Sequence, residues 1–185
     1  MRRQLWDFLK NPTYREDENK NIDHRLRIFS KLVLFSLVLS FLFATFLGIL
    51  EIVFKLNLGE HAMDTFVKEY PVLSLFFGAV ILAPVLEELV FRGPMLFFKE
   101  KSYFRIVFYV LTVLFGFLHI SNFELSTIVI LLSPILVLPQ LAIGVILGFI
   151  RVRFGLLWSM ALHACYNGIL IIPLVLAKLL KLPLA

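Results

Sequence analysis

The chain has 185 residues, of which 60% are hydrophobic, 17% are charged and twenty are phenylalanine. Its mean hydropathy of +0.91 excludes an ordinary water-soluble fold, because a chain of this length cannot bury so much apolar surface, and it indicates a protein surrounded by lipid. The net charge of +5 lies mostly in the first 31 residues, which indicates a membrane-topology signal and not a nucleic-acid-binding surface.

Residues 1–28 are polar and of mixed charge, and we predict that they form a cytosolic tail. They are not expected to be a cleavable signal peptide, because no apolar core follows directly on a short basic stretch. Two alternatives are open for their first turns. Leu5, Trp6, Phe8 and Leu9 can form a short interfacial turn, or the whole segment can be a partly ordered tail.

Five apolar segments follow, and each is long enough, the third only just, to cross a hydrocarbon core of about 30 Å at about 1.5 Å of rise per residue. We predict membrane-spanning helices over residues 29–54, 71–98, 103–120, 127–150 and 154–177. Pro134 and Pro139 can break the fourth of these into a shorter or re-entrant piece. The predicted fold is all-α: a polytopic transmembrane domain over residues 29–185, a bundle of about five helices with a buried polar site.

The basic residues divide unevenly between the segments that connect these spans. With the N-terminus inside, the inner segments hold thirteen lysines and arginines and the outer segments hold four, while Arg92 lies within a span. This distribution follows the positive-inside rule. We therefore predict a multi-pass membrane protein with its N-terminus in the cytosol.

Several polar side chains fall inside the predicted spans, where ionisable groups are costly and are functional candidates by default. They are Glu87, Glu88, Arg92, His119, His163 and Asn167. These residues come from three different spans, and each carries a desolvation cost unless it meets a polar partner. We therefore predict that they meet in one shared site.

The spacing of these residues assigns them different tasks. Glu88 and Arg92 are four residues apart, so they share a helix face and can form an ion pair. Glu87 is rotated by about 100° from Glu88 and stays free for chemistry. Asn167 follows His163 by four residues, so it can orient the imidazole or hold a substrate oxygen.

Two prolines flank the glutamates. Neither Pro84 nor Pro94 can donate a backbone hydrogen bond, so we expect helix irregularities on both sides of Glu87 and Glu88. Ser159 lies four residues before His163 on the same face, but nothing in its sequence context marks it as a nucleophile.

Glutamate and histidine around a buried water can act as general base and general acid for amide hydrolysis. The same side chains can instead hold a zinc ion, with Glu87, His119 and His163 as ligands. A helical pair of histidines four residues apart is absent from the sequence, so both alternatives stay open at this point.

Three motifs carry a resemblance to a known family: Glu87-Glu88-x-x-x-Arg92, Phe115-x-x-x-His119 and His163-x-x-x-Asn167. In this order, each on its own apolar segment, they resemble the CPBP family of CAAX proteases and bacteriocin-processing enzymes, also called Abi proteins. The resemblance implies an intramembrane endopeptidase with a catalytic core at about residues 71–173.

The resemblance also implies roles for the site residues. Glu87 and His119 would activate the attacking water, while His163 and Asn167 would stabilise the oxyanion. Glu88 and Arg92 would be supporting residues. The family is often labelled as metalloproteases, and a metal-free glutamate mechanism has also been proposed for it, so a zinc cofactor and none are both open.

The short chain, with only one span before the motifs, resembles bacterial members of the family and implies the bacterial inner membrane. The expected partners are membrane lipids and a membrane-associated peptide or protein substrate, with no nucleic acid. Peptide maturation, bacteriocin self-immunity and cleavage of a membrane-bound regulator are all open. The alternative is a non-catalytic scaffold or bacteriocin-immunity protein of the same fold, in which the polar cluster only holds helices together.

Overall fold

The computed structural model describes residues 1–59 and 62–181, and every regular element within those ranges is a helix. The elements in chain order are α1 (Arg2–Lys10), α2 (Ile22–Phe54), α3 (Ala62–Glu69), α4 (Val72–Phe76), the π-helix η1 (Phe77–Leu82), α5 (Ala83–Phe91), the 3-10 helix η2 (Pro94–Phe98), α6 (Phe104–Leu118), the 3-10 helix η3 (His119–Asn122), α7 (Thr127–Leu136), α8 (Leu138–Phe154) and α9 (Leu156–Leu179).

Consecutive helices join into long apolar stretches that can cross a membrane. In the described part of the chain there are five of them: Ile22–Phe54, Val72–Phe98, Phe104–Asn122, Thr127–Phe154 and Leu156–Leu179. Large apolar side chains such as Phe41, Phe97 and Leu131 point outward from these stretches, as expected for a surface covered by lipid tails. The predicted all-α class and the five spans are confirmed.

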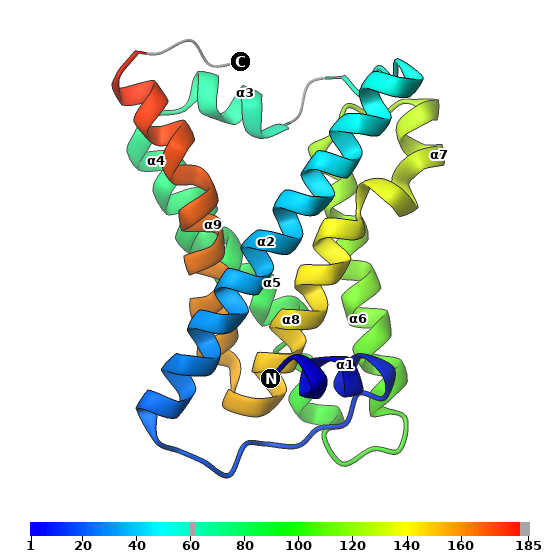
Figure 1. Ribbon diagram of the computed structural model, residues 1–185, viewed down its shortest axis with the longest axis vertical. Helices are drawn as coiled ribbons and strands as arrows, with labels where there is room; N and C mark the ends of the chain where they lie inside the picture. Colours follow the sequence, from blue (N-terminus) through cyan, green and yellow to red (C-terminus); the bar gives the residue numbers. More distant parts are fainter. Residues whose placement is uncertain (60–61, 182–185) are drawn as a thin grey trace.

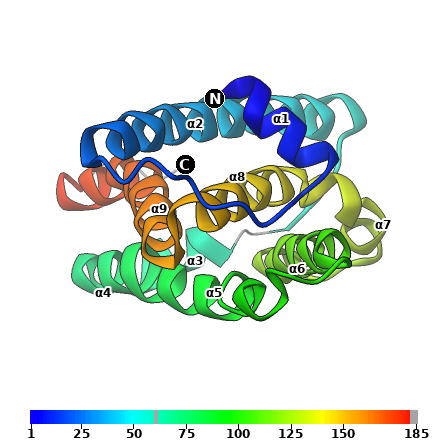
Figure 2. The same ribbon diagram turned by 90° about the horizontal axis from the view of Figure 1, so that it is seen from below.

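The spans pack around α8 and α9. Helix α8 contacts α2 and α6, while α9 contacts α2, α5 and η1. The helices converge at the end of the bundle where α1 lies and diverge toward the end where α3 lies (Figure 1). Viewed along the bundle, α8 and α9 lie between α2 on one side and α4, α5 and α6 on the other (Figure 2).

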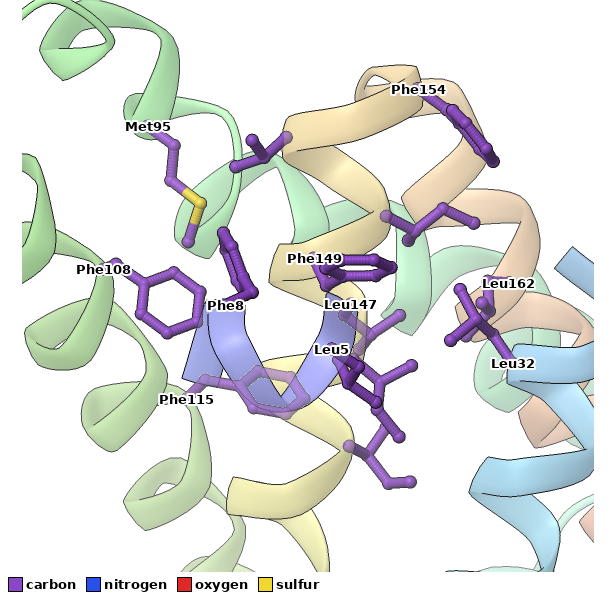
Figure 3. Close-up of a cluster of buried hydrophobic side chains, with 14 of the residues drawn as sticks. Leu5, Phe8, Leu32, Met95, Phe108, Phe115, Leu147, Phe149, Phe154 and Leu162 are labelled. Atoms are coloured by element: carbon purple, nitrogen blue, oxygen red, sulfur yellow. The ribbon is translucent and has the colours of Figure 1, made fainter. Parts of the chain in front are cut away.

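The N-terminal helix α1 is part of the core at the converging end. Leu5 and Phe8 are buried while Trp6 is exposed, so one face of α1 packs on the bundle. Phe8 makes edge-to-face contacts with Phe108 and Phe149, at ring-centroid distances of 5.0 and 5.4 Å (Figure 3). Of the two alternatives for this segment, the structure has a packed helix and not a loose tail.

Helix α2 begins earlier than the expected boundary at residue 29. The side chain of Asn21 accepts a hydrogen bond from the His24 N–H at 3.1 Å, which caps the helix and starts it at Ile22. Hydropathy alone does not predict this start, because residues 22–28, the first two turns of α2, are helical but largely polar.

The segment between α1 and α2 is fastened to the end of α8. The Asp17 N–H donates to the Arg153 carbonyl at 3.0 Å, and the Arg153 guanidinium donates to the Asp17 carboxylate. Burial raises the pKa of Asp17, but the hydrogen bonds and positive charge around it outweigh burial and hold that pKa below its ordinary value. Arg151 also donates to the Tyr14 hydroxyl at 3.1 Å, so two arginines bind this segment.

The fourth span is interrupted between its two prolines, as their presence suggested. Helix α7 ends at Leu136 and α8 begins at Leu138. Pro139 lies in the first turn of α8, where a missing N–H has no cost. Pro134 cannot donate to the Ile130 carbonyl, and the Ser133 hydroxyl donates to it instead at 2.8 Å. The break at Val137 turns the first residues of α8 toward the interior.

Glycines let α6 and α8 approach each other closely. A Cβ on Gly148 would lie 2.5 Å from Cε2 of Phe108, and a Cβ on Gly116 would lie 2.4 Å from Cδ2 of Leu141. Both distances are well inside van der Waals contact. Small residues at such crossings are how membrane helices gain packing energy in the absence of a hydrophobic driving force between them.

We predict that Gly148→Ala destabilises the bundle by about 1–3 kcal/mol, because the added methyl group displaces the Phe108 ring. The matched control is Gly48→Ala in α2, where a Cβ would meet no described atom within 4 Å. That control should be neutral or slightly stabilising, since alanine is the better helix former. Thermal unfolding in detergent measures both variants, and equal melting temperatures would contradict the packing described.

Candidate active site

The six polar residues predicted to meet do lie together. Glu87 and Glu88 come from α5, His119 from the junction of α6 and η3, and His163 and Asn167 from α9. Arg92 follows α5 as its C-terminal cap residue. The helices that carry them are adjacent, because α5 packs against both α6 and α9.

Glu88 is the fully buried centre of this group, with 0% of its surface exposed. Its Oε1 lies 3.3 Å from Arg92 Nη1 and 3.0 Å from His163 Nδ1. The Ser159 hydroxyl donates to its other oxygen. The ion pair predicted from the four-residue spacing is therefore present, and Glu88 also binds α9 at two positions one turn apart.

Arg92 is also fully buried, and it contacts three further groups. Its guanidinium carbon lies 3.8 Å from the centroid of the Phe115 ring, close enough for a cation–π interaction. Its Nη2 donates to the Gly144 carbonyl of α8 at 3.4 Å. Its own carbonyl accepts from Arg151 Nε at 3.0 Å. Arg92 thereby connects α5, α6 and α8.

Glu87 points away from that pair, toward the two histidines. Its Oε2 lies 3.9 Å from His119 Nε2 and 3.8 Å from His163 Nε2. Both distances are too long for direct hydrogen bonds. This buried oxygen has no hydrogen-bond partner among the described residues.

The other ring nitrogen of each histidine determines what faces Glu87. His119 Nδ1 lies 2.9 Å from the Phe115 carbonyl, which can only accept, so the proton is on Nδ1. His163 Nδ1 faces the Glu88 carboxylate, and the same reasoning applies. In their neutral forms both histidines therefore present an unprotonated Nε2 to the Glu87 carboxylate. Three acceptors face one another, an arrangement that favours a ligand carrying hydrogen-bond donors or positive charge.

Asn167 is held by an irregularity in the neighbouring helix. The Ala83 N–H bonds the Gly78 carbonyl, five residues back, within the π-helix η1. This leaves the Ala79 carbonyl without its usual helical donor, and Pro84 has no N–H to replace it. Asn167 Nδ2 donates to that carbonyl at 2.9 Å. Of the two tasks open to Asn167, orienting the imidazole of His163 belongs instead to Glu88.

Both irregularities expected at the prolines are present, the π-helix η1 before Pro84 and the 3-10 helix η2 from Pro94. Ser159 has a structural partner in Glu88 and does not line the cavity described next. In the sequence, Ser159 could be placed one turn before His163, but its partner Glu88 could not be predicted from that spacing.

A cavity of about 590 Å³ leads to these residues. It extends along about three turns of α9, from His163 to Leu174. Its lining is Ala79, Ala83, Glu87, Phe115, Leu118, His119, Ser121, Asn122, Pro139, Gln140, Ile143, His163, Tyr166, Asn167, Leu170, Ile171 and Leu174. Most of this lining is apolar, so the cavity suits a peptide with apolar side chains.

Four of the cavity's polar residues were not among the sequence candidates. The Tyr166 hydroxyl pairs with Ser40 Oγ of α2 at 2.6 Å, and the Ser121 hydroxyl donates to the Leu118 carbonyl at 2.7 Å. Asn122 and Gln140 are the other two. The only signal for Gln140 in the sequence is that it is an uncharged polar residue in an apolar segment. A search for ionisable groups does not find such a residue.

Zinc was one of the open alternatives for Glu87, His119 and His163. Among residues 1–59 and 62–181, no three His, Cys, Asp or Glu side chains are grouped as a metal site. Ligands of a tetrahedral zinc ion lie about 3.3 Å apart, whereas the separations at Glu87 Oε2 are 3.8 and 3.9 Å. These separations are wider than those of a zinc-bound set, so no step of the proposed reaction is assigned to a zinc ion. Zinc held by Glu87, His119 and His163 stays the alternative to a metal-free mechanism.

The fold and the site together define an integral membrane protein with a buried glutamate–histidine centre at the end of a cavity. The family model described as Type II CAAX prenyl endopeptidase Rce1-like matches residues 69–169. This is more than half of the chain and includes all six polar site residues, so the chain belongs to that family. No curated protein and no solved structure matches the chain.

We predict that Arg92→Ala destabilises the protein far more than Glu87→Gln does. Loss of Arg92 leaves the Glu88 carboxylate buried without its counter-charge, a cost on the order of 3–5 kcal/mol. Glu87→Gln removes a charge that has no ion pair with arginine. Thermal unfolding of both variants in the same detergent measures the difference, and equal melting temperatures would contradict the separate tasks of the two glutamates.

Proposed function

We propose that this protein is an intramembrane endopeptidase in which Glu87 activates a water molecule for attack on a peptide bond. One observation supports this most strongly: two histidine Nε2 atoms and a carboxylate oxygen converge at 3.8–3.9 Å. A single water can donate its two hydrogen bonds to two of these three acceptors, which leaves its oxygen lone pairs free to attack. Membership of an endopeptidase family supports the same reaction.

In the proposed reaction, Glu87 accepts a proton from the water while the water oxygen attacks the carbonyl carbon of the scissile bond. His119 Nε2, fixed by its Nδ1 contact with Phe115, orients the water. When the C–N bond breaks, the proton passes from Glu87 to the leaving nitrogen. The products are a carboxylic acid and an amine, and the carboxylate of Glu87 is regenerated.

The developing oxyanion is assigned to Asn167 and His163. An asparagine amide has two N–H groups, and Asn167 uses one for the Ala79 carbonyl. The second can donate to the substrate oxygen. His163 can donate through Nε2 in its protonated form, while Glu88 holds its Nδ1. Donors fixed in advance are the most effective stabilisers of such charge.

The proposed substrate is a membrane-associated peptide or protein. The apolar cavity lining supports this, as does the family description, which names a prenylated CAAX protein end as the substrate class. The excess of basic residues on one side supports an orientation with the N-terminus in the cytosol. In that orientation the helices diverge toward the extracytoplasmic side. The membrane is proposed to be a bacterial inner membrane.

We predict that Glu87→Gln and His119→Ala each lower the cleavage rate by about a thousandfold while the melting temperature stays within a few degrees of wild type. The measurement is cleavage of a farnesylated peptide by protein reconstituted in liposomes, beside thermal unfolding of the same preparations. The scaffold alternative predicts the opposite result, a loss of stability from the same substitutions. Wild-type turnover in either variant would contradict the proposed function.

We also predict that removing metal ions leaves turnover unchanged, because Glu87 and the histidines complete the proposed proton transfers without one. The measurement is metal analysis of the purified protein, followed by cleavage assays before and after a zinc chelator. Stoichiometric zinc, together with activity that the chelator abolishes and added zinc restores, would overturn this mechanism and support the zinc alternative.

A further inference from the structure

Gln140 lies in the wall of the active-site cavity and has an unused acceptor. It is one of the lining residues, together with Glu87, His119, His163 and Asn167. Its side-chain oxygen Oε1 is buried and has no hydrogen-bond partner within the described ranges. Burying an amide oxygen without a hydrogen-bond donor costs free energy. A donor on a bound ligand would remove that cost.

Three other polar side chains of the cavity have partners of their own. The Ser121 hydroxyl donates to the Leu118 carbonyl, the Tyr166 hydroxyl pairs with Ser40, and Asn167 donates to the Ala79 carbonyl. Gln140 is thus distinguished from these three neighbours, each of which has a protein partner. A ligand in the cavity can supply the missing N–H or O–H.

The break in the fourth span sets the height of Gln140 in the cavity. Helix α8 starts at Leu138, so Gln140 lies in its first turn, four residues before Gly144. The Gly144 carbonyl accepts from Arg92 beside the catalytic residues. Four residues of α-helix rise about 6 Å, which equals about two residues of an extended peptide. For a peptide that runs along α8, Gln140 is therefore about two substrate residues from the level of Gly144 and Arg92.

We propose that Gln140 is a substrate-positioning residue whose Oε1 accepts a hydrogen bond from one backbone N–H of the bound peptide, within about two residues of the scissile bond. This inference rests on the proposed peptidase function. It adds a specificity rule, because proline or an N-methylated residue has no N–H to donate at that substrate position. The apolar lining accepts many side chains, so this contact with the main chain sets the register of the peptide.

The test compares Gln140→Met, which keeps the size of the side chain but has no such acceptor, with Gln140→Glu, which keeps a carbonyl-type oxygen. Thr45→Val in α2 is the control, because it removes a hydroxyl that already has a partner, the Phe41 carbonyl, and that lies outside the cavity lining. The probe is a farnesylated fluorogenic peptide ending in cysteine and three apolar residues, with variants N-methylated at one position at a time.

We expect Gln140→Met to raise KM about tenfold with kcat changed less than about twofold, the pattern of a lost contact made equally in the ground and transition states. Gln140→Glu should recover most of the loss. The melting temperature of Gln140→Met should not fall, since the Oε1 that it removes has no hydrogen-bond partner among the described residues. N-methylation at one position of the peptide should raise the KM of the wild type about tenfold and leave the KM of Gln140→Met unchanged.

The inference is overturned if Gln140→Met keeps the wild-type KM, or if every N-methylated peptide affects the two proteins equally. Anisotropy of the same peptides bound to Glu87→Gln, with and without Gln140→Met, measures the contact without turnover. A wild type that binds the probe and does not cleave it would refute the peptidase function, while the anisotropy comparison still decides the role of Gln140. A loss of melting temperature in Gln140→Met would show a structural role instead.

Discussion

The buried carboxylate of Glu88 is the constraint on which the rest of the site depends. A charge with no exposed surface is tolerated only with partners, and here Arg92, His163 and Ser159 provide them. These contacts fix the rotation of α5 against α9. Once α5 is fixed, the preceding residue, Glu87, must point in another direction, which leads to the histidine Nε2 atoms and the cavity.

The same network extends to the N-terminal segment. Arg151 donates to the Arg92 carbonyl and to the Tyr14 hydroxyl, so a residue outside the spans is two contacts away from the Glu88 ion pair. The Asp17–Arg153 contacts and the packing of Phe8 hold that segment in place. The N-terminal segment thereby covers the converging end of the bundle, while the helices diverge toward the other end (Figure 1).

Much of the site was predictable because charge is rare in an apolar sequence. Glu88 and Arg92 could be paired from their spacing alone, since helix geometry places residues four apart on one face. Asn167 shows the limit: its partner, the Ala79 carbonyl, is free only because a π-helix and Pro84 withdraw two donors, which is a property of the folded backbone. Gln140 and the early start of α2 were missed for a similar reason, because hydropathy does not record hydrogen-bond satisfaction or helix capping.

The central claim is that Arg92 is coupled far more strongly to Glu88 than to Glu87. Two double-mutant cycles in detergent test it, one combining Arg92→Met with Glu88→Gln and the other combining Arg92→Met with Glu87→Gln. For the first cycle we expect an interaction free energy of about 3 kcal/mol, because removing both charges avoids the buried unpaired charge that either single substitution leaves. For the second we expect less than about 0.5 kcal/mol. Equal interaction energies in the two cycles, or the larger one for Glu87, would contradict the division of tasks between the glutamates.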